Sequence, residues 1–276
     1  MVGGEQRQHQ RGLRGLAGGV IVSIKESTGH APVALVTGAA GGVGRATVEA
    51  LRHRGYDILA IDVAESVAEL ATNDKSGGRV VSRVVDVRGE GASAASAALA
   101  EREFGRLDLL VNNAGRFLQK PISEVTADEF DELFAINARS AFLHSRDCLP
   151  HLRRTGGSIV NLASTSGFVG VAGQSVYAMT KGAIVQLTRQ LAIEEASRGV
   201  RVNAVAPGAI DTDFTAAVRA ADPDPEGSRA RSLARHPIGR YSTASEVAAA
   251  ICFLASDDAS AITGSILSVD GGYLAQ

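Results

Sequence analysis

The sequence lacks tryptophan and contains few other aromatic residues. Aromatic side chains make up only 4% of the 276 residues, whereas 45% are hydrophobic, largely Ala, Val, Leu and Ile. Small and branched aliphatic side chains suit close packing of helices on a sheet better than an aromatic-rich β-sandwich does. The composition therefore favours an α/β fold.

Cysteine and histidine are also scarce. Cys148 and Cys252 lie far apart and form no CxxC pair, and the six histidines form no HxxxH or similar pair. Zinc sites need clustered ligands, and structural disulfides need an oxidising compartment. We therefore expect two buried thiols in a reducing, cytoplasmic compartment and no metal site.

No charge of one sign dominates, and no long hydrophobic run is present. The 28 basic and 30 acidic residues give a formal charge of −2, so we expect neither nucleic acid nor a membrane as a partner. The uncharged run 15–23 is too short to span a bilayer. Basic residues precede it, as in a signal peptide, but no small-residue cleavage site is clear. A disordered N-terminal extension over residues 1–30 is therefore the favoured interpretation.

A strand, a glycine-rich loop and a helix follow this extension. The apolar run 33–37 is typical of a parallel strand buried on both faces, and the periodicity of 45–54 predicts a helix. Between them, TGAAGGVG at 37–44 permits a tight turn and a close approach of the backbone to a ligand. Because free N–H groups at a helix start attract a pyrophosphate, this order predicts a dinucleotide site.

The second predicted strand, 56–62, ends in an acid. Asp62 stands 24 residues beyond Gly38, close to the spacing at which a carboxylate meets the adenosine ribose. A carboxylate accepts hydrogen bonds from the ribose hydroxyls and repels a 2′-phosphate, which favours NAD(H) over NADP(H). The alternative is a solvated acid at a strand end, and the cations Arg45 and Arg83 are near enough in sequence to weaken the preference.

Two further strands are expected at 80–87 and 107–111, with a helix at 92–103 between them. Asp86 could bond the adenine amino group or cap that helix. The turn residues Asn-Asn-Ala-Gly at 112–115 could hold a cofactor ribose or brace the sheet.

A long helical pattern over 127–149 contains Asn137 among apolar neighbours. A buried amide without partners costs about 1–3 kcal/mol. One interpretation is therefore a structural Asn that bridges backbone groups.

The chain then alternates strands and helices to its end. Strand 158–162 delivers three hydroxyl residues at 164–166, which could line a site or make turn hydrogen bonds. Strands 200–206 and 265–269 flank a helix at 246–255. No repeat or interdomain linker interrupts residues 31–276, which predicts a single domain.

Tyr177 and Lys181 stand one turn apart on a predicted helix that begins near residue 175. A phenol titrates near pH 10, and a neighbouring ammonium favours the phenolate and lowers its pKa toward the range that suits a general acid or base. Such a pair also arises by chance in many helices, so its meaning depends on the other motifs.

Together these motifs resemble the classical short-chain dehydrogenase/reductase family. The match comprises TGAAGGVG at 37–44, the acid at 62, NNAG at 112–115 and YAMTK at 177–181, and it extends over residues 33–273. The resemblance implies one Rossmann-type, doubly wound domain whose seven-stranded parallel sheet is flanked by helices. It also implies a homotetramer or homodimer and a substrate lid at about 211–237.

The resemblance implies four catalytic roles. Tyr177 would be the general acid/base, and Lys181 would lower its pKa and bind the nicotinamide ribose. Ser164, thirteen residues before Tyr177, would bind the substrate oxygen. Asn137 would hold a water that links Lys181 to solvent.

The resemblance also assigns the cofactor site. Ile210 would donate its backbone N–H to the carboxamide, and Thr212 would reach the carboxamide or the phosphate. The full expected set is Thr37, Gly38, Gly41, Gly42, Val43, Gly44, Asp62, Asp86, Val87, Asn113, Ala114, Gly115, Tyr177, Lys181, Pro207, Gly208, Ile210 and Thr212.

The predicted function is NAD(H)-dependent interconversion of a secondary alcohol and a ketone. One alternative is an NADPH-dependent 3-oxoacyl-(acyl-carrier-protein) reductase, and another is a non-catalytic NAD(H)-sensing regulator. An apolar substrate is expected because the predicted pocket walls contain Phe117, Phe168, Val169, Val171 and Phe214.

Overall fold

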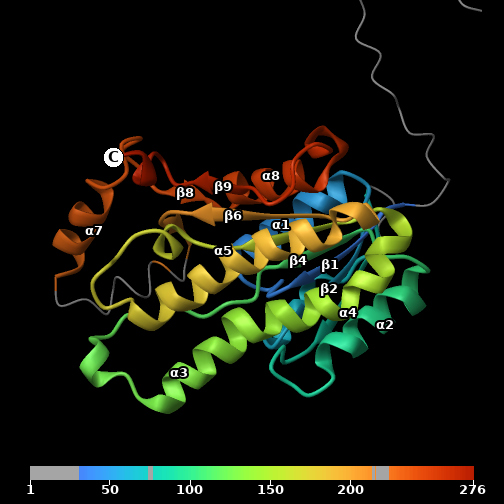
Figure 1. The fold of residues 1–276 in the computed structure, drawn as a ribbon, viewed down its shortest axis with the longest axis horizontal. Coiled ribbons are helices and arrows are strands. Elements are labelled where there is room, and N and C mark those ends of the chain that lie inside the picture. Colours follow the sequence, from blue (N-terminus) through green and yellow to red (C-terminus); the bar gives the residue numbers. More distant parts are fainter. Residues whose placement is uncertain (1–30, 74–76, 213–214, 216–223) are drawn as a thin grey trace, which may run out of the picture. The chain divides into compact units, whose positions relative to one another are not determined.

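A seven-stranded parallel sheet is the centre of the computed structural model, which describes residues 31–73, 77–212, 215 and 224–276 (Figure 1). The strand order is β3-β2-β1-β4-β5-β6-β9. The strands are β1 Val33–Thr37, β2 Asp57–Asp62, β3 Val80–Val84, β4 Leu109–Asn112, β5 Ser158–Leu162, β6 Arg201–Pro207 and β9 Ile266–Val269. The predicted doubly wound sheet is confirmed, and its order reverses between β1 and β4, where ligands bind in such folds.

The central strands are apolar along their whole length because both faces of the sheet are covered. Every residue of β1 is buried, and Leu35 is in register with Leu59 of β2 and Leu110 of β4. A short second sheet pairs β7 (Ile210–Asp211) with β8 (Ser242–Thr243).

Helices cover both faces of the large sheet (Figure 1). Apolar residues of α1 and α8 pack in one core cluster, and those of α2, α4 and α5 pack in another on the opposite face. The α-helices are α1 Gly42–His53, α2 Ala92–Phe104, α3 Ala127–Phe134, α4 Ser140–Thr155, α5 Ser175–Glu195, α7 Pro225–Leu233 and α8 Ala244–Ala255. Short 3-10 turns lie at Glu65–Leu70, Ile122–Glu124, Thr165–Gly167, Ala196–Arg198, Asp257–Ala259 and Tyr273–Ala275.

The predicted helix over 127–149 is wrong in one respect. It begins at a capping box, in which Thr126 and Glu129 bond each other's backbone N–H, but a π-helix at Ala135–Arg139 separates α3 from α4. A π-turn accommodates one extra residue and is frequent at functional sites. This one turns Asn137 inward.

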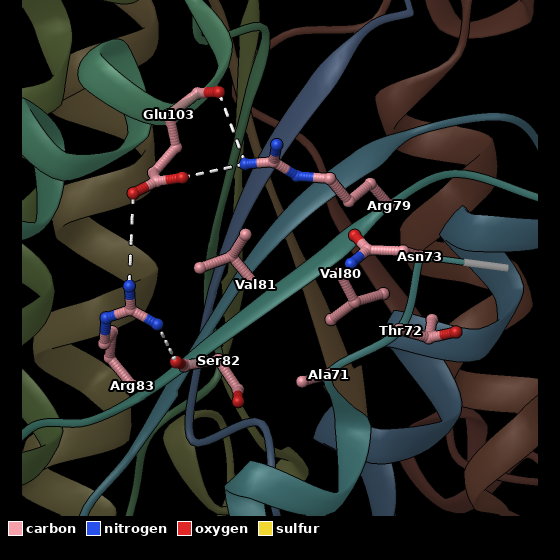
Figure 2. A pocket seen from close by; sticks show the side chains of 9 residues that line it. All are labelled: Ala71, Thr72, Asn73, Arg79, Val80, Val81, Ser82, Arg83 and Glu103. Atoms are coloured by element: carbon pink, nitrogen blue, oxygen red, sulfur yellow. Dashed lines mark hydrogen bonds and ion pairs between the residues drawn. The ribbon is translucent and has the colours of Figure 1, made fainter.

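The edge strand β3 carries a shallow hollow of about 400 Å³ (Figure 2). In Figure 2, Glu103 of α2 faces Arg79 and Arg83, with N···O distances of 2.8 and 4.0 Å. Charged side chains on an edge strand discourage pairing with another chain. We therefore interpret this hollow as edge protection.

Among the described residues, no helix combines the length and the apolar character that crossing a membrane requires. Cys148 and Cys252 are both buried and unpaired. The predicted extension over 1–30 lies outside the described residues, as do 213–214 and 216–223 of the predicted lid.

Candidate active site

A cavity of about 1300 Å³ opens at the carboxyl ends of the strands. It gathers most of the predicted cofactor residues together with Ser164, Tyr177 and Lys181. Thr37, Pro207 and Asn137 are the predicted residues that do not line it. The predicted residues that do are Gly38, Gly41, Gly42, Val43, Gly44, Asp62, Asp86, Val87, Asn113, Ala114, Gly115, Ser164, Tyr177, Lys181, Gly208, Ile210 and Thr212.

Two glycines of the loop leave no room for a side chain. Gly38 has a φ of +65°, and a Cβ there would stand 2.7 Å from the Ala114 Cα. A Cβ at Gly44 would overlap the Gly38 carbonyl oxygen. Helix α1 begins after Gly41 without a side-chain cap, so the first N–H groups of α1 remain available for an anion. The cradle fits a diphosphate.

Asn113 braces this loop. Its Nδ2 donates to the backbone oxygens of Thr37 at 3.0 Å and Gly38 at 2.8 Å. A second pair of hydrogen bonds joins the same segments: the Thr37 Oγ1 accepts from the N–H groups of Asn113 and Ala114. Of the two roles left open for residues 112–115, the side chain of Asn113 performs the bracing role.

Asp62 ends β2 at the cavity wall. Its carboxylate oxygens accept from the N–H groups of Ala40 and Ala64, each at 2.9 Å. Each oxygen has a second lone pair, so the carboxylate can still accept from a diol. The two nearby cations point elsewhere: Arg45 pairs with Glu69 at 3.2 Å, and Arg83 approaches Glu103.

Asp86 lies beyond the end of β3, not within the predicted strand 80–87. The helix-cap alternative is wrong, because Gly91 precedes α2 and no side chain caps it. Instead, the Arg88 guanidinium and backbone N–H both donate to Asp86. These hydrogen bonds hold the pKa of Asp86 below its usual value.

Helix α5 presents Tyr177 and Lys181 to the cavity. Tyr177 is partly exposed, and its ring meets Phe117 edge to face at 4.9 Å between centroids. Lys181 is buried, and its Nζ donates to the Leu162 backbone oxygen at 2.7 Å. The distance from this Nζ to the centroid of the Tyr177 ring is 5.7 Å.

The lowering of the Tyr177 pKa by Lys181 stays a prediction. Burial raises the pKa of Tyr177 to about 12, and only a hydrogen bond with Ser164 acts to lower it. Burial also lowers the pKa of Lys181 to about 8. The Lys181 ammonium donates to the Leu162 backbone oxygen.

Ser164 stands at the carboxyl end of β5 as predicted. Its Oγ accepts from the Ser166 N–H at 3.2 Å. The Ser164 hydroxyl also acts to lower the pKa of Tyr177. The hydroxyl thus makes the turn contact and also faces the phenol. Thr165 and Ser166 line the cavity beside it.

Asn137 is buried in the π-helix. Its Oδ1 accepts from the Arg116 N–H at 2.7 Å, and its Nδ2 donates to the Arg116 oxygen at 2.8 Å and to the Thr180 Oγ1 at 3.0 Å. The predicted bridging of backbone groups is confirmed. A Cβ placed on Gly115 would lie 3.5 Å from this Oδ1 and 3.7 Å from the Lys181 Nζ, so both polar groups border the same small space.

His236 is a residue that the sequence reasoning missed. It is buried, its Nε2 accepts from the Ala209 N–H at 3.1 Å, and its Nδ1 lies 2.8 Å from the Ser232 oxygen. His236 therefore connects the end of α7 to the segment that leads into β7. No motif marks it, because its partner Ala209 is 27 residues away.

The predicted apolar walls are only partly present. Phe117 and Val171 line the cavity, but Phe168 and Val169 are exposed at the surface and do not. Phe214 lies outside the described residues. Polar and cationic side chains of α7 also line the cavity, and the sequence reasoning did not assign them a role.

Comparisons with known proteins identify relatives of the whole domain. A family model described as Enoyl-(Acyl carrier protein) reductase matches residues 38–274. The chain is 42% identical over 246 residues to cis-4-hydroxycyclohexanecarboxylate dehydrogenase of Sinomonas cyclohexanicum, covering 88% of this chain and 96% of that protein. It is 34% identical over 245 residues to a 3-oxoacyl-(acyl-carrier-protein) reductase of Thermotoga maritima, covering 88% and 97%. The crystal structure of levodione reductase has a TM-score of 0.81 at 35% identity, covering 88% of this chain and 98% of that one.

Proposed function

Because the chain belongs to the classical short-chain dehydrogenase/reductase family, whose members are NAD(P)-dependent oxidoreductases, we propose that it interconverts a secondary alcohol and a ketone with NAD(H). The main support is that Tyr177 and Ser164 line the same cavity as the glycine cradle. Since the relatives are oxidoreductases, the non-catalytic sensor is set aside.

The proposed reaction assigns the proton to Tyr177. In ketone reduction its phenol donates a proton to the carbonyl oxygen, and the raised pKa keeps the phenol protonated at neutral pH. In alcohol oxidation Tyr177 must first lose that proton, so oxidation should accelerate as pH rises. Ser164 steadies the substrate oxygen by a hydrogen bond whose loss in comparable sites costs about 3–4 kcal/mol.

The bound nicotinamide cofactor would supply or accept the hydride. The glycine cradle and the start of α1 would hold its diphosphate. Directly before β7, the Ala209 oxygen accepts from the Ser242 N–H, and successive residues of an extended segment direct their N–H groups to opposite sides. The Ile210 N–H is therefore directed away from β8, which supports its proposed bond to the carboxamide.

Asp62 supports NAD(H) as the proposed nucleotide. Its carboxylate lines the cavity while Arg45 and Arg83 are turned to other partners, so a 2′-phosphate would meet negative charge without a compensating cation from these two residues. Asp62→Ala should shift the ratio of kcat/KM values toward NADPH. Tighter binding of NADPH than of NADH by the unaltered protein would contradict the proposal.

The relatives support a ketone or secondary alcohol as the substrate class. One carries the name of a hydroxylated cyclohexanecarboxylate and another is named a levodione reductase. A panel of cyclic and acyclic alcohols and ketones, assayed with both nucleotides by absorbance of the reduced nicotinamide, tests this proposal directly.

A second candidate is reduction of 3-oxoacyl groups on an acyl-carrier protein. The Thermotoga maritima relative supports it, and the carboxylate of Asp62 counts against its NADPH requirement. Acetoacetyl-carrier protein should be a poor substrate with either nucleotide. Efficient turnover with NADPH would favour this candidate instead.

We further propose a homotetramer, or a homodimer, in the cytoplasm. Phe142 of α4 and Ile193 of α5 are large apolar side chains left 49% and 80% exposed, which supports association through these helices. Light scattering of the purified protein tests the assembly. The unpaired cysteines support a reducing compartment.

A further inference from the structure

One side of α7 lines the cavity with polar and cationic groups. Ser228, Arg231 and Ser232 recur at the spacing of one face of α7, and Arg235 stands in the turn that follows the helix. All four line the cavity. Helix α7 buries none of its own side chains. In Figure 1, α7 and the first turns of α5 lie on the same side of the domain, toward which β6 points. The cationic face therefore belongs to the catalytic cavity.

Two of the arginines on this side, Arg229 and Arg235, pair with no acid among the described residues. Arg235 donates to a neutral partner, the Tyr273 hydroxyl, at 3.0 Å. Arg229 also lines the cavity, and no acid within the described part of the chain pairs with it. Arg231 pairs with Asp224 at 3.1 Å, but both side chains are largely exposed.

The acids that line the cavity are engaged elsewhere. Asp86 and Glu132 are both held by Arg88, and Glu132 also pairs with Arg116 at 2.7 Å. Asp62 is bonded to the glycine loop. The side formed by α7 consequently keeps an excess of positive charge.

The wall around the reacting phenol has the opposite character. Phe117, Ile136 and Val171 line the cavity, and Phe117 contacts the Tyr177 ring directly. A ligand that matches both walls has an apolar body at Tyr177 and a negative group at α7.

Arg235 is held ready for such a group. Its guanidinium lies 5.7 Å from the Tyr273 ring centroid and gives one N–H to the Tyr273 hydroxyl. A guanidinium has five N–H donors, so others remain for a bidentate bond to a carboxylate or sulfonate. The end of α7 is itself anchored by His236 to Ala209.

We propose that the substrate is an anionic alcohol or ketone, a carboxylate or sulfonate with an apolar body, and that Arg235 binds the anionic group. This inference rests on the proposed oxidoreductase function and adds the substrate class. It assigns Arg235 to substrate selection and leaves Tyr177 and Ser164 as the residues that contact the reacting oxygen.

The test compares a carboxylate with its uncharged amide. Cyclohexanecarboxylate and cyclohexanecarboxamide are titrated calorimetrically into the full-length protein in the presence of NAD. The unaltered protein should bind the carboxylate at least about tenfold more tightly, because a charge-assisted bidentate pair contributes more than a neutral hydrogen bond. Equal affinity for the two ligands would overturn the proposal.

The variant arm uses Arg235→Gln with Arg240→Gln as its matched control. Arg240 is an exposed arginine that pairs with Glu246 at 2.6 Å and does not line the cavity. Arg235→Gln should weaken binding of the carboxylate by about tenfold and leave the affinity for the amide unchanged. Arg240→Gln should change neither affinity. If Arg235→Gln lost binding of both ligands, or of NAD, Arg235 would be needed for the fold or for the cofactor, and the proposal would be overturned. Arg235→Lys, which keeps the charge, should retain part of the preference.

Kinetics separate this inference from the function beneath it. With 4-oxocyclohexanecarboxylate and 4-oxocyclohexanecarboxamide, Arg235→Gln should raise KM for the carboxylate alone and leave kcat for the amide unchanged. If the carboxylate preference persists in titration while no alcohol or ketone is turned over, the oxidoreductase proposal fails and the anion site stands. If both ketones are turned over equally well, the anion site fails and the function stands.

Discussion

The two ends of α5 carry buried charges of opposite kinds. Near its start, Lys181 is 4% exposed and donates to the neutral carbonyl of Leu162, and no described carboxylate pairs with it. At its end, Glu195 is 2% exposed and accepts two hydrogen bonds of 2.7 Å from Arg153 and one of 3.0 Å from Arg198. The same helix thus holds one compensated charge and one uncompensated charge.

The pKa directions express this difference. The hydrogen bonds from Arg153 hold the pKa of Glu195 below its usual value, whereas burial lowers the pKa of Lys181 from 10.5 to about 8. At neutral pH the second shift corresponds to a cost of about 3 kcal/mol for keeping the ammonium charged in the fold. Removing one partner of the compensated pair should therefore destabilise the fold, whereas removing the uncompensated ammonium should not.

The largest expected effect is at the catalytic end. Tyr177→Phe removes the proton donor, so kcat should fall by about 10³-fold or more. The free energy of unfolding should hardly change, because the hydroxyl bonds only Ser164 among the groups that shift its pKa. Steady-state kinetics, NADH titration and urea denaturation measure the three quantities. A variant that keeps most of its turnover on a good substrate would refute the assignment.

Lys181→Met should separate activity from stability. Turnover should fall by about 10²-fold, while the free energy of unfolding at pH 7 should rise by about 2 kcal/mol after the loss of the Leu162 bond. The folded-state pKa is about 8 and the unfolded value 10.5, so the unfolded protein binds the extra proton between these values. The stability advantage of the variant is therefore complete below pH 8 and should vanish by about pH 10.5.

Urea denaturation of both proteins at pH 7 and pH 10.5 gives this comparison. Arg189→Met provides the control, because Arg189 is an exposed cation on the same helix. If Lys181→Met were less stable than the unaltered protein at pH 7, the Lys181 ammonium would have to be stabilised by partners in the fold, which would contradict this prediction.

Glu195→Gln should show the reverse pattern. The variant should lose about 2 kcal/mol of stability, less than for a fully buried ion pair, because Arg153 and Arg198 are partly solvated. Its kcat should be unchanged. Because the folded-state pKa of Glu195 is lowered, its contribution is present above the unfolded value of 4.5 and is lost as pH falls below it. The difference in unfolding free energy between the two proteins should therefore be smaller at pH 3.5 than at pH 7, and an equal difference at both pH values would contradict the pairing.

The smallest effects distinguish the two arginines. Arg153 makes a bidentate contact and is less exposed, so Arg153→Met should cost about 1 kcal/mol. Arg198 makes a single contact and is 53% exposed, so Arg198→Met should cost less than about 0.5 kcal/mol. Thermal melts of the two variants, side by side, show whether the order holds.

The sheet and the glycine cradle were predictable because their signals are local. An apolar strand, a run of glycines and a helix follow one another directly at 33–53, and Tyr177 and Lys181 are separated by one helical turn. The direction of the Lys181 ammonium was not predictable, because spacing fixes the position of a residue and not the partner that its long side chain selects.

Contacts between distant segments were missed for the same reason. His236 meets Ala209, and Arg235 meets Tyr273, only after the chain has folded. Asn137 was expected to bridge backbone groups, but the π-helix that directs it toward Arg116 leaves no pattern in a sequence whose periodicity reads as one continuous helix.

The π-helix at Ala135–Arg139 makes the number of residues, and not only their identity, critical at this point. An α-helix turns by about 100° per residue, so deleting one residue here would rotate α4 by that angle relative to α3. Either Asn137 would leave the Arg116 backbone, or Cys148 and Leu152 would leave the core. A deletion scan should therefore find 135–139 intolerant, even at the exposed Arg139, where we expect a substitution to have little effect.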